Sequence, residues 1–404
     1  SALKPVRSAL ILSESGAVAQ SYAAAAQALL LLGIVPLYSG FAARVNRLRL
    51  TAFVTVFFSS NLVIFYVLGQ SGVRIGIPFF IWIGIFNLMV PALLWALAND
   101  VYTNSRGKRL LPLVGLGASL GAWIGAEVAA ALFRILGPYP LMLYAAGALF
   151  VCLGLTYWVH RREGAASEES EAGRAEAQKP IGGAGGFQLV LKQRYLLYIG
   201  LLMVVLNTVN TLGEFVLGRM VEIEAVRVVA ASGGSVNEAQ WIGGFMARFQ
   251  ANVNLLGLLL QLFVASRVIK YIGVRGALFV MPLVSLASYS IIAFIPLLSI
   301  VRVAKTIENS TDYSIQNTTR QALFLPTSRE AKYKAKQAID SFFWRAGDML
   351  QAVVVFASTA LAFGVQGIAL LNLVFVALWL VLVVAITREH KKLVPVENPI
   401  EVAA

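Results

Sequence analysis

Long runs of apolar residues recur along the whole chain, with short polar stretches between them. Eleven runs approach the ~20 residues that an α-helix needs to cross a bilayer. They lie at 18–38, 50–68, 78–98, 111–132, 140–159, 195–216, 245–266, 274–294, 296–318, 338–362 and 365–386. The runs are too long and too continuously apolar for the alternating ~10-residue strands of an outer-membrane barrel. The pattern therefore predicts an all-α polytopic membrane protein.

A shorter apolar run occupies residues 1–12 and begins with Ser1. A helix of this length rises only ~18 Å, which is too little for a hydrocarbon core of ~30 Å. We interpret the run as the second half of a helix 1 whose first half is missing, so that helix 1 is truncated. With this helix counted, the pattern predicts 12 transmembrane helices.

One stretch, at 160–194, interrupts the apolar pattern and is rich in Glu, Ala, Gly and Ser. This composition is typical of a flexible linker. We expect it to separate an N-terminal six-helix half at 1–159 from a C-terminal six-helix half at 195–390, with a tail at 391–404. Short motifs recur at matching helices of the two halves, namely Ala43-Arg-Val-Asn-Arg47 with Ser266-Arg-Val-Ile-Lys270, and Asn99-Asp-Val-Tyr102 with Thr311-Asp-Tyr-Ser314. Two parallel six-helix repeats are typical of a major facilitator-like fold.

The composition supports a membrane protein. Of the 404 residues, 58% are hydrophobic and 13% are charged, and the mean hydropathy is +0.76. In a soluble domain about a quarter of the residues are charged, and such a domain cannot bury so much apolar surface. The single cysteine, Cys152, excludes an internal disulfide and a cysteine-based metal site, and two histidines form no cluster. We expect no metal and no cofactor.

The net charge of +13 reflects orientation in the membrane. Of the basic residues in the loops, 23 lie on one predicted side and 5 on the other. The positive-inside rule places the richer side in the cytoplasm, together with both termini and the linker. We expect a multi-pass protein of a bacterial inner membrane, in contact with the lipid bilayer. We expect no nucleic acid polymer as a partner.

Polar residues form a stripe on the helix predicted at 296–318. Arg302, Lys305, Asn309, Asp312 and Gln316 follow one another at spacings of 3, 4, 3 and 4, which places them on one helical face. Such a stripe cannot face lipid. Two compatible interpretations stay open: it lines a water-filled cavity, or it forms an internal salt-bridge face in which Lys305 pairs with Glu308 at i,i+3.

Further polar groups lie in other predicted helices, including Lys4, Arg7, Asn87, Asn207, Asn210 and Glu214. In major facilitator folds the first, fourth, seventh and tenth helices line the central cavity, and these residues fall on those helices. Arginine and lysine bind carboxylate or phosphate, so an anionic small molecule is the expected substrate. The predicted substrate-binding residues are Lys4, Arg7, Asn87, Asn207, Asn210, Glu214, Arg302, Lys305, Glu308, Asn309 and Asp312. We assign a structural or coupling role to the charges of Glu127, Arg345 and Asp348.

Motifs of enzymes are absent from the sequence. It contains no Gly-x-x-x-x-Gly-Lys-Ser/Thr loop, no zinc motif and no Gly-x-Ser-x-Gly elbow in a soluble domain, since Gly117-Ala-Ser-Leu-Gly121 lies within the apolar run at 111–132. We therefore expect no catalytic residues and no enzymatic activity.

Three blocks of sequence resemble the nucleotide exchange transporters, the ATP/ADP translocase family of plastids and intracellular bacteria with relatives in free-living bacteria. The blocks are Leu3-Lys-Pro-Val-Arg-Ser-Ala-Leu10; Ala98-Asn-Asp-Val-Tyr102 with Lys108-Arg-Leu-Leu-Pro-Leu-Val-Gly-Leu-Gly-Ala118; and Asp312-Tyr-Ser314 with Arg320, Pro326 and Lys332-Tyr-Lys-Ala-Lys-Gln-Ala-Ile-Asp340. The resemblance implies a major facilitator-like transporter.

The family's functional charges carry over in part. Arg7 matches a basic position of the exchangers, and Glu214 matches a glutamate of theirs. Asn87 stands where they have a glutamate, and Asp312 stands where they have a lysine, with Lys305 two turns away. An acidic residue in place of a basic one weakens phosphate binding.

We therefore expect a secondary active transporter of an organic anion, with a nucleotide as the specific candidate. It would act as a monomer by alternating access of its two halves. Arg7 and Lys305 would contact the anion, and Glu214 with Glu308 or Asp312 would pair with them in the empty site or carry a coupling cation. Two alternatives stay open: a proton- or cation-coupled symporter or exporter of a different solute, and a membrane scaffold or sensor that transports nothing.

Overall fold

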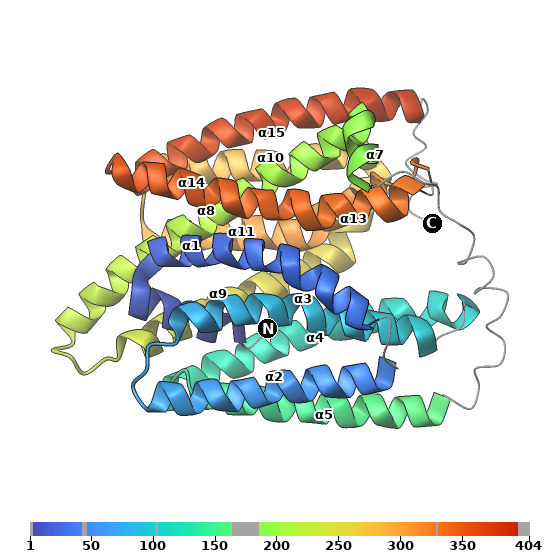
Figure 1. The fold of residues 1–404 in the computed structure, drawn as a ribbon. Helices are drawn as coiled ribbons and strands as arrows, with labels where there is room; N and C mark the ends of the chain where they lie inside the picture. The colour runs from blue at the N-terminus through green and yellow to red at the C-terminus, as the bar shows by residue number, and fades with distance from the viewer. Residues whose placement is uncertain (1–2, 43–46, 102–103, 164–185, 329, 395–404) are drawn as a thin grey trace. The chain divides into compact units, whose positions relative to one another are not determined.

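The computed structural model describes residues 3–42, 47–101, 104–163, 186–328 and 330–394 (Figure 1). Helices make up nearly all of these residues, and no β-strand occurs among them. The all-α prediction is thereby confirmed. The predicted linker lies largely outside the described residues, as does most of the predicted tail.

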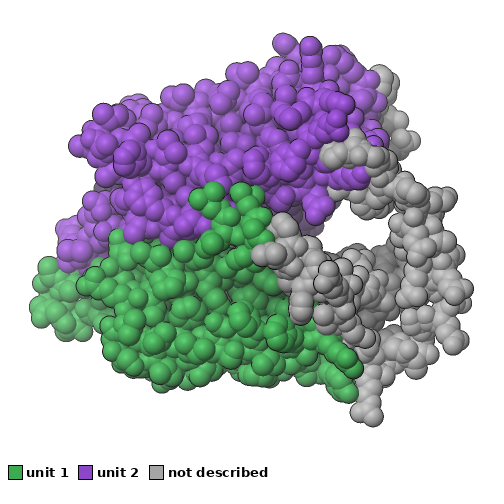
Figure 2. All heavy atoms as spheres, in the orientation of Figure 1, with its two compact units in different colours: residues 1–15, 29–180, 229–251 green, residues 16–28, 181–228, 252–404 purple. Residues whose placement is uncertain are grey.

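The chain divides into two compact units (Figure 2). Unit 1 comprises residues 1–15, 29–180 and 229–251, and unit 2 comprises residues 16–28, 181–228 and 252–404. The chain passes from unit 1 to unit 2 between Ser15 and Gly16, where a kink with non-helical backbone angles interrupts α1. Gly16 has φ 82° and ψ 173°, a conformation that glycine adopts without the strain of a Cβ atom.

The helices that contribute to unit 1 begin with α1. They are α1 (Leu3–Ala42), α2 (Arg47–Gln70), α3 (Gly76–Val101), α4 (Asn104–Leu136), α5 (Pro140–Glu163) and the first part of α9 (Glu238–Leu260). Aromatic rings pack α2 against α3, because Phe58 meets Trp82 edge-on at 5.3 Å between centroids. Trp82 also stacks on Phe86 at 5.7 Å. Offset and edge-to-face arrangements of this kind are the favourable ones for aromatic side chains.

Unit 2 contains the remaining helices. They are α7 (Gly186–Lys192), α8 (Arg194–Ala231), η2 (Gln261–Ala265), α10 (Ser266–Phe294), α11 (Leu298–Thr311), η3 (Asp312–Gln316), α12 (Asn317–Ala322), η4 (Ala331–Ala335), α13 (Lys336–Ala338), η5 (Ile339–Phe343), α14 (Trp344–Ala360) and α15 (Val365–Leu393), in which η marks a π-helical segment. A second glycine, Gly273, breaks α10 with φ 70° and ψ 176°. The stretch predicted as linker ends in a short helix, α7.

In the part of the chain that the structure describes, six helical stretches are long and apolar enough to cross a membrane. They are Leu3–Ile34, Arg49–Gln70, Pro140–Trp158, Arg194–Ala231, Glu238–Phe294 and Val365–Leu393. The chain is therefore a multi-pass membrane protein. Several predicted spans fall within longer helices. The span predicted at 18–38 is part of α1, which begins at Leu3 and is kinked at Gly16. The span predicted at 274–294 begins directly after the kink at Gly273 in α10. The count of 12 transmembrane helices stays a prediction.

Candidate functional site

A buried ion pair lies at the centre of the polar residues of unit 2. The Nζ atom of Lys305 on α11 lies 2.8 Å from Glu308 Oε2, one helical turn further on, and both side chains are wholly buried. The same ammonium group donates to Asn210 Oδ1 on α8 at 3.0 Å. A buried lysine without such partners would be strongly disfavoured, because desolvating a charge is expensive.

Helix α10 supplies two further partners for the carboxylate of Glu308. The Ser285 hydroxyl donates to Oε1 at 2.9 Å, and the Tyr289 hydroxyl lies 2.9 Å from Oε2 as its donor. Ser285 and Tyr289 are four residues apart, so they share one face of α10. Sequence analysis missed both, although this spacing within an apolar helix is a signal that could have identified them. The ion pair thus joins α8, α10 and α11.

Glu214 on α8 is the most exposed carboxylate of this cluster. Its Oε1 atom accepts a hydrogen bond from Asn309 Nδ2 at 2.7 Å and lies 4.0 Å from Lys305 Nζ. About a third of its side chain (31%) is exposed, whereas Lys305 is completely covered. Glu308 and Glu214 therefore share one lysine, with Glu308 on its buried side and Glu214 on its more accessible side.

A glycine on α8 makes room for the cluster. A Cβ atom on Gly213 would overlap the Tyr289 hydroxyl and lie 2.8 Å from Lys305 Nζ. Any larger residue there would displace the two side chains that hold Glu308. The close approach of α8 to α10 and α11 therefore depends on this position.

Carboxylates outnumber lysines in the cluster. Asp312 is buried on the same face of the helix as Lys305, and no residue in the described part of the chain forms a salt bridge with it. Glu214, Glu308 and Asp312 thus carry up to three negative charges, against the ammonium group of Lys305 and the guanidinium group of Arg320, whose charge also acts on Asp312. Uncompensated charge is costly in a buried site, so a bound proton or cation would stabilise this arrangement.

A second polar network links α8 to α14. Asn207 Nδ2 donates to Asp348 Oδ1 at 2.7 Å and to the Trp344 carbonyl at 2.8 Å. Arg345 lies 3.2 Å from Asp348 Oδ2. The predicted residues Asn207, Arg345 and Asp348 therefore lie together. A Cβ on Gly347 would come within 2.8 Å of Asn207 Cβ, which shows how closely the two helices approach.

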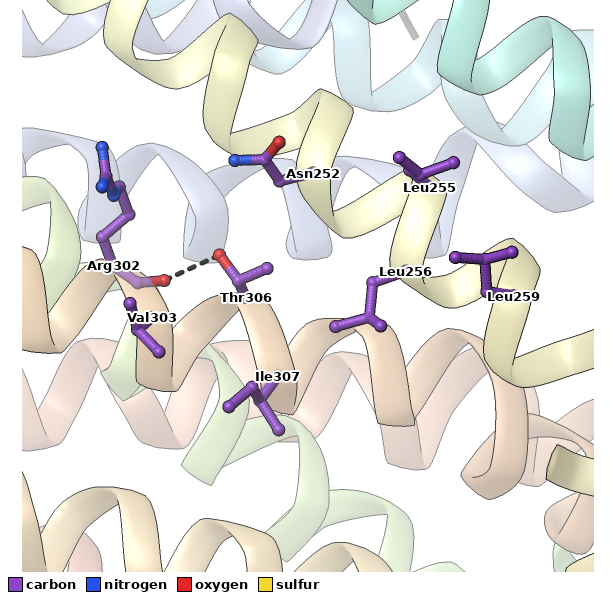
Figure 3. Close-up of a pocket in the computed structure, with 8 residues that line it drawn as sticks. All are labelled: Asn252, Leu255, Leu256, Leu259, Arg302, Val303, Thr306 and Ile307. Atoms are coloured by element: carbon purple, nitrogen blue, oxygen red, sulfur yellow. Dashed lines mark hydrogen bonds between the residues drawn. The ribbon is translucent and has the colours of Figure 1, made fainter.

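Arg302, the first residue of the predicted stripe, is separated from the others. Lys305, Asn309, Asp312 and Gln316 are buried, whereas Arg302 is exposed at a cavity of about 400 Å³ between α9 and α11 (Figure 3). Within the described part of the chain, the guanidinium group of Arg302 has no hydrogen-bond or salt-bridge partner. The residues that line the cavity are Asn252, Leu255, Leu256, Leu259, Arg302, Val303, Thr306 and Ile307.

The predicted residues of the N-terminal half lie in unit 1. The Arg7 guanidinium lies 4.4 Å from the centroid of the Phe80 ring, within the range of a cation–π interaction. Lys4 is half-buried, and Asn87 and Glu127 are exposed. Sequence analysis missed Glu14, whose Oε2 accepts a hydrogen bond from the backbone N–H of Gly76 at 2.6 Å, at the start of α3.

The fold defines a class of protein, the all-α multi-pass membrane proteins. The crystal structure of the E. coli fucose:proton symporter superposes with a TM-score of 0.50 at 14% sequence identity, and the match covers 95% of this chain and 97% of that one. At this identity the likeness concerns the fold.

The family follows from the sequence. The model of the TLC ATP/ADP transporter family matches residues 49–390, so the chain belongs to this family. The predicted resemblance is thereby confirmed.

Curated relatives are transporters of chlamydiae. ADP,ATP carrier protein 1 of Chlamydia muridarum is 23% identical, over 63% of this chain and 53% of the relative. ADP,ATP carrier protein 2 of Chlamydia pneumoniae is 24% identical, over 75% of this chain and 64% of the relative. The matches thus cover between about half and just under two thirds of these relatives.

Proposed function

We propose that the protein is a secondary active transporter that exchanges organic anions, with nucleoside triphosphate against nucleoside diphosphate as the specific reaction. The observation that carries the proposal is the match of residues 49–390 to a family of ATP/ADP transporters. The relatives named above are ADP,ATP carriers. Alternating access in a major facilitator-like fold would carry the anion across the bilayer without a chemical step, so the protein would not act as an enzyme.

Within this proposal, Arg7 and Lys305 supply positive charge for the transported anion. In the structure, Lys305 is held by Glu308 and lies 4.0 Å from Glu214. An incoming phosphate would compete with Glu214, the more accessible of the two carboxylates, for the ammonium group. Glu308 would keep Lys305 in place through this exchange.

The protein would reside in a bacterial inner membrane as a monomer, with both termini in the cytoplasm. The distribution of basic residues supports this orientation, with 23 on one side of the predicted topology and 5 on the other.

The direct test is exchange in proteoliposomes. Vesicles loaded with unlabelled ADP should accumulate labelled ATP, and vesicles without internal nucleotide should accumulate little. Transport of other anions with no movement of any nucleoside di- or triphosphate would reject nucleotide exchange.

Proton- or cation-coupled transport of a different solute is the second candidate, and the excess of carboxylates over lysine around Lys305 favours it. A carboxylate that gains and loses a proton during transport links the substrate to a proton gradient. Uptake that follows an imposed pH gradient, and that is lost in Glu214→Gln, would support this candidate. Uptake that depends only on internal counter-substrate would reject it.

A further inference from the structure

Two basic residues lie one turn apart on α11 and have opposite surroundings. Lys305 is completely buried and its ammonium group is held by Glu308 and Asn210. Arg302 is exposed, and its guanidinium has no partner among the described residues. The stretch 296–318 is predicted to span the membrane, where an arginine is costly unless it meets an anion or water. In the state that the structure shows, Arg302 is therefore the cation of α11 that can receive a ligand.

The cavity beside Arg302 has a polar end and an apolar end. Figure 3 shows the side chains of Asn252 and Arg302 at one end and those of three leucines at the other. The amide of Asn252 is exposed and, like the guanidinium of Arg302, has no hydrogen-bond partner among the described residues. The Thr306 hydroxyl donates to the Arg302 carbonyl at 2.7 Å, so this side chain adds little polarity to the cavity.

We propose that this cavity binds a nucleotide, with a phosphate at Arg302, the edge of the base at Asn252 and the face of the base against Leu255, Leu256 and Leu259. The inference rests on the proposed function and assigns a binding site for its substrate.

The chemistry of the lining residues fits each part of such a ligand. A guanidinium group forms paired hydrogen bonds with phosphate oxygens, with a geometry that an ammonium group lacks. An asparagine amide offers one donor and one acceptor side by side, which is the arrangement that pairs with the edge of adenine. The volume of about 400 Å³ lies within the range of small-molecule sites.

A phospholipid would match the cavity less well. Its phosphate could also meet Arg302, but its acyl chain would then lie against Asn252. Burying an amide against hydrocarbon without a hydrogen bond is unfavourable. The unpartnered Asn252 therefore favours a ligand whose apolar part carries hydrogen-bonding groups at its edge.

Binding of labelled ADP to the purified full chain in lipid nanodiscs tests the proposal. Arg302→Ala should weaken binding by about tenfold or more, the loss expected when a charge-assisted hydrogen bond to phosphate is removed. Leu256→Trp should abolish binding by filling the cavity, with every charge retained. Arg248→Ala removes an exposed arginine of α9 outside the cavity and should bind ADP like the wild type.

A second comparison separates the base from the phosphate. Asn252→Leu should reduce the preference for ADP over pyrophosphate, because pyrophosphate has no base for the amide to contact. Thermal unfolding of each variant without ligand identifies any variant that fails to fold. If Arg302→Ala fails to fold, Arg302→Lys replaces it as a test that keeps the charge and changes the phosphate-binding geometry. We expect Arg302→Lys to bind ADP more weakly than the wild type.

Four results would overturn the proposal. Wild-type affinity for ADP in Leu256→Trp would show that the nucleotide binds elsewhere. Unchanged ADP binding in Arg302→Ala, with loss of co-purified anionic phospholipid in native mass spectra, would assign the cavity to lipid. Absence of ADP binding and exchange by the wild type would reject both the proposed function and this site, whereas exchange that persists in Arg302→Ala and Leu256→Trp would reject the site alone.

Discussion

The ammonium group of Lys305 lies 2.8 Å from the carboxylate of Glu308, and neither side chain is exposed. The two residues lie one turn apart on α11, so helix geometry alone brings them close. Tyr289 and Ser285 from α10 and Asn210 from α8 complete their hydrogen bonds. The pair therefore connects three helices of unit 2 as well as providing charge.

Removing one member of this pair should destabilise the protein severely. Lys305→Met leaves Glu308 buried without its cation, and breaking a buried pair in this way costs about 3–5 kcal/mol. We expect a large fall in the unfolding temperature of the purified protein in detergent. The double variant Lys305→Met with Glu308→Leu should recover much of the loss, because no buried charge is then left alone. A double variant no more stable than Lys305→Met would contradict this explanation.

Gly213→Ala should destabilise the same region by overpacking. The added methyl group would overlap the Tyr289 hydroxyl, so the side chains must shift at a cost of about 1–3 kcal/mol. Gly257→Ala on α9 is a matched control, because its Cβ meets no atom closer than 3.7 Å. Thermal unfolding of both variants measures the difference. Equal unfolding temperatures would show that the cluster tolerates the methyl group.

Asn207→Ala should loosen the contact between α8 and α14. It removes hydrogen bonds to Asp348 and to the Trp344 carbonyl, and a hydrogen bond to a charged group contributes about 1.5–3 kcal/mol. We expect faster hydrogen exchange of backbone amides in α14 than in the wild type. Exchange that rises equally in α15 would point to general destabilisation and would count against a specific link.

Glu14→Ala should weaken unit 1 at the start of α3. The Glu14 carboxylate accepts from the Gly76 N–H at 2.6 Å, and a negative charge at a helix N-terminus contributes about 0.3–1 kcal/mol. We expect a modest fall in unfolding temperature. Ser15→Ala removes an exposed hydroxyl group next to Glu14 on α1 and should have no such effect. If both variants behave alike, the hydrogen bond to Gly76 contributes nothing measurable.

The fold class could be predicted because a helix that crosses a membrane needs a long apolar run, and such runs are visible in the sequence. A run such as 365–386 is long and continuously apolar, and α15 covers it from Val365 to Leu393. The limits of the compact units could not be predicted. Residues 16–28 belong to unit 2 and residues 229–251 to unit 1, and such membership depends on packing between segments far apart in the sequence.

Helical periodicity placed five polar residues of α11 and η3 on one face, but it could not distinguish their surroundings. Arg302 lies at the edge of this face beside the cavity, whereas Lys305 points into unit 2. Which neighbour each meets depends on α8, α9 and α10. Ser285 and Tyr289 were missed because their partner, Glu308, lies on a different helix and is identified only when α10 packs against α11.

Counterflow in proteoliposomes tests the central claim most directly. Vesicles that contain the wild-type protein and internal unlabelled ADP are placed in labelled ATP, and accumulated label is followed with time. We predict uptake that requires internal nucleotide, that Arg302→Ala reduces, that Leu256→Trp abolishes, and that Arg248→Ala leaves unchanged. Uptake by the wild type no greater than that of protein-free vesicles would contradict nucleotide exchange by this protein.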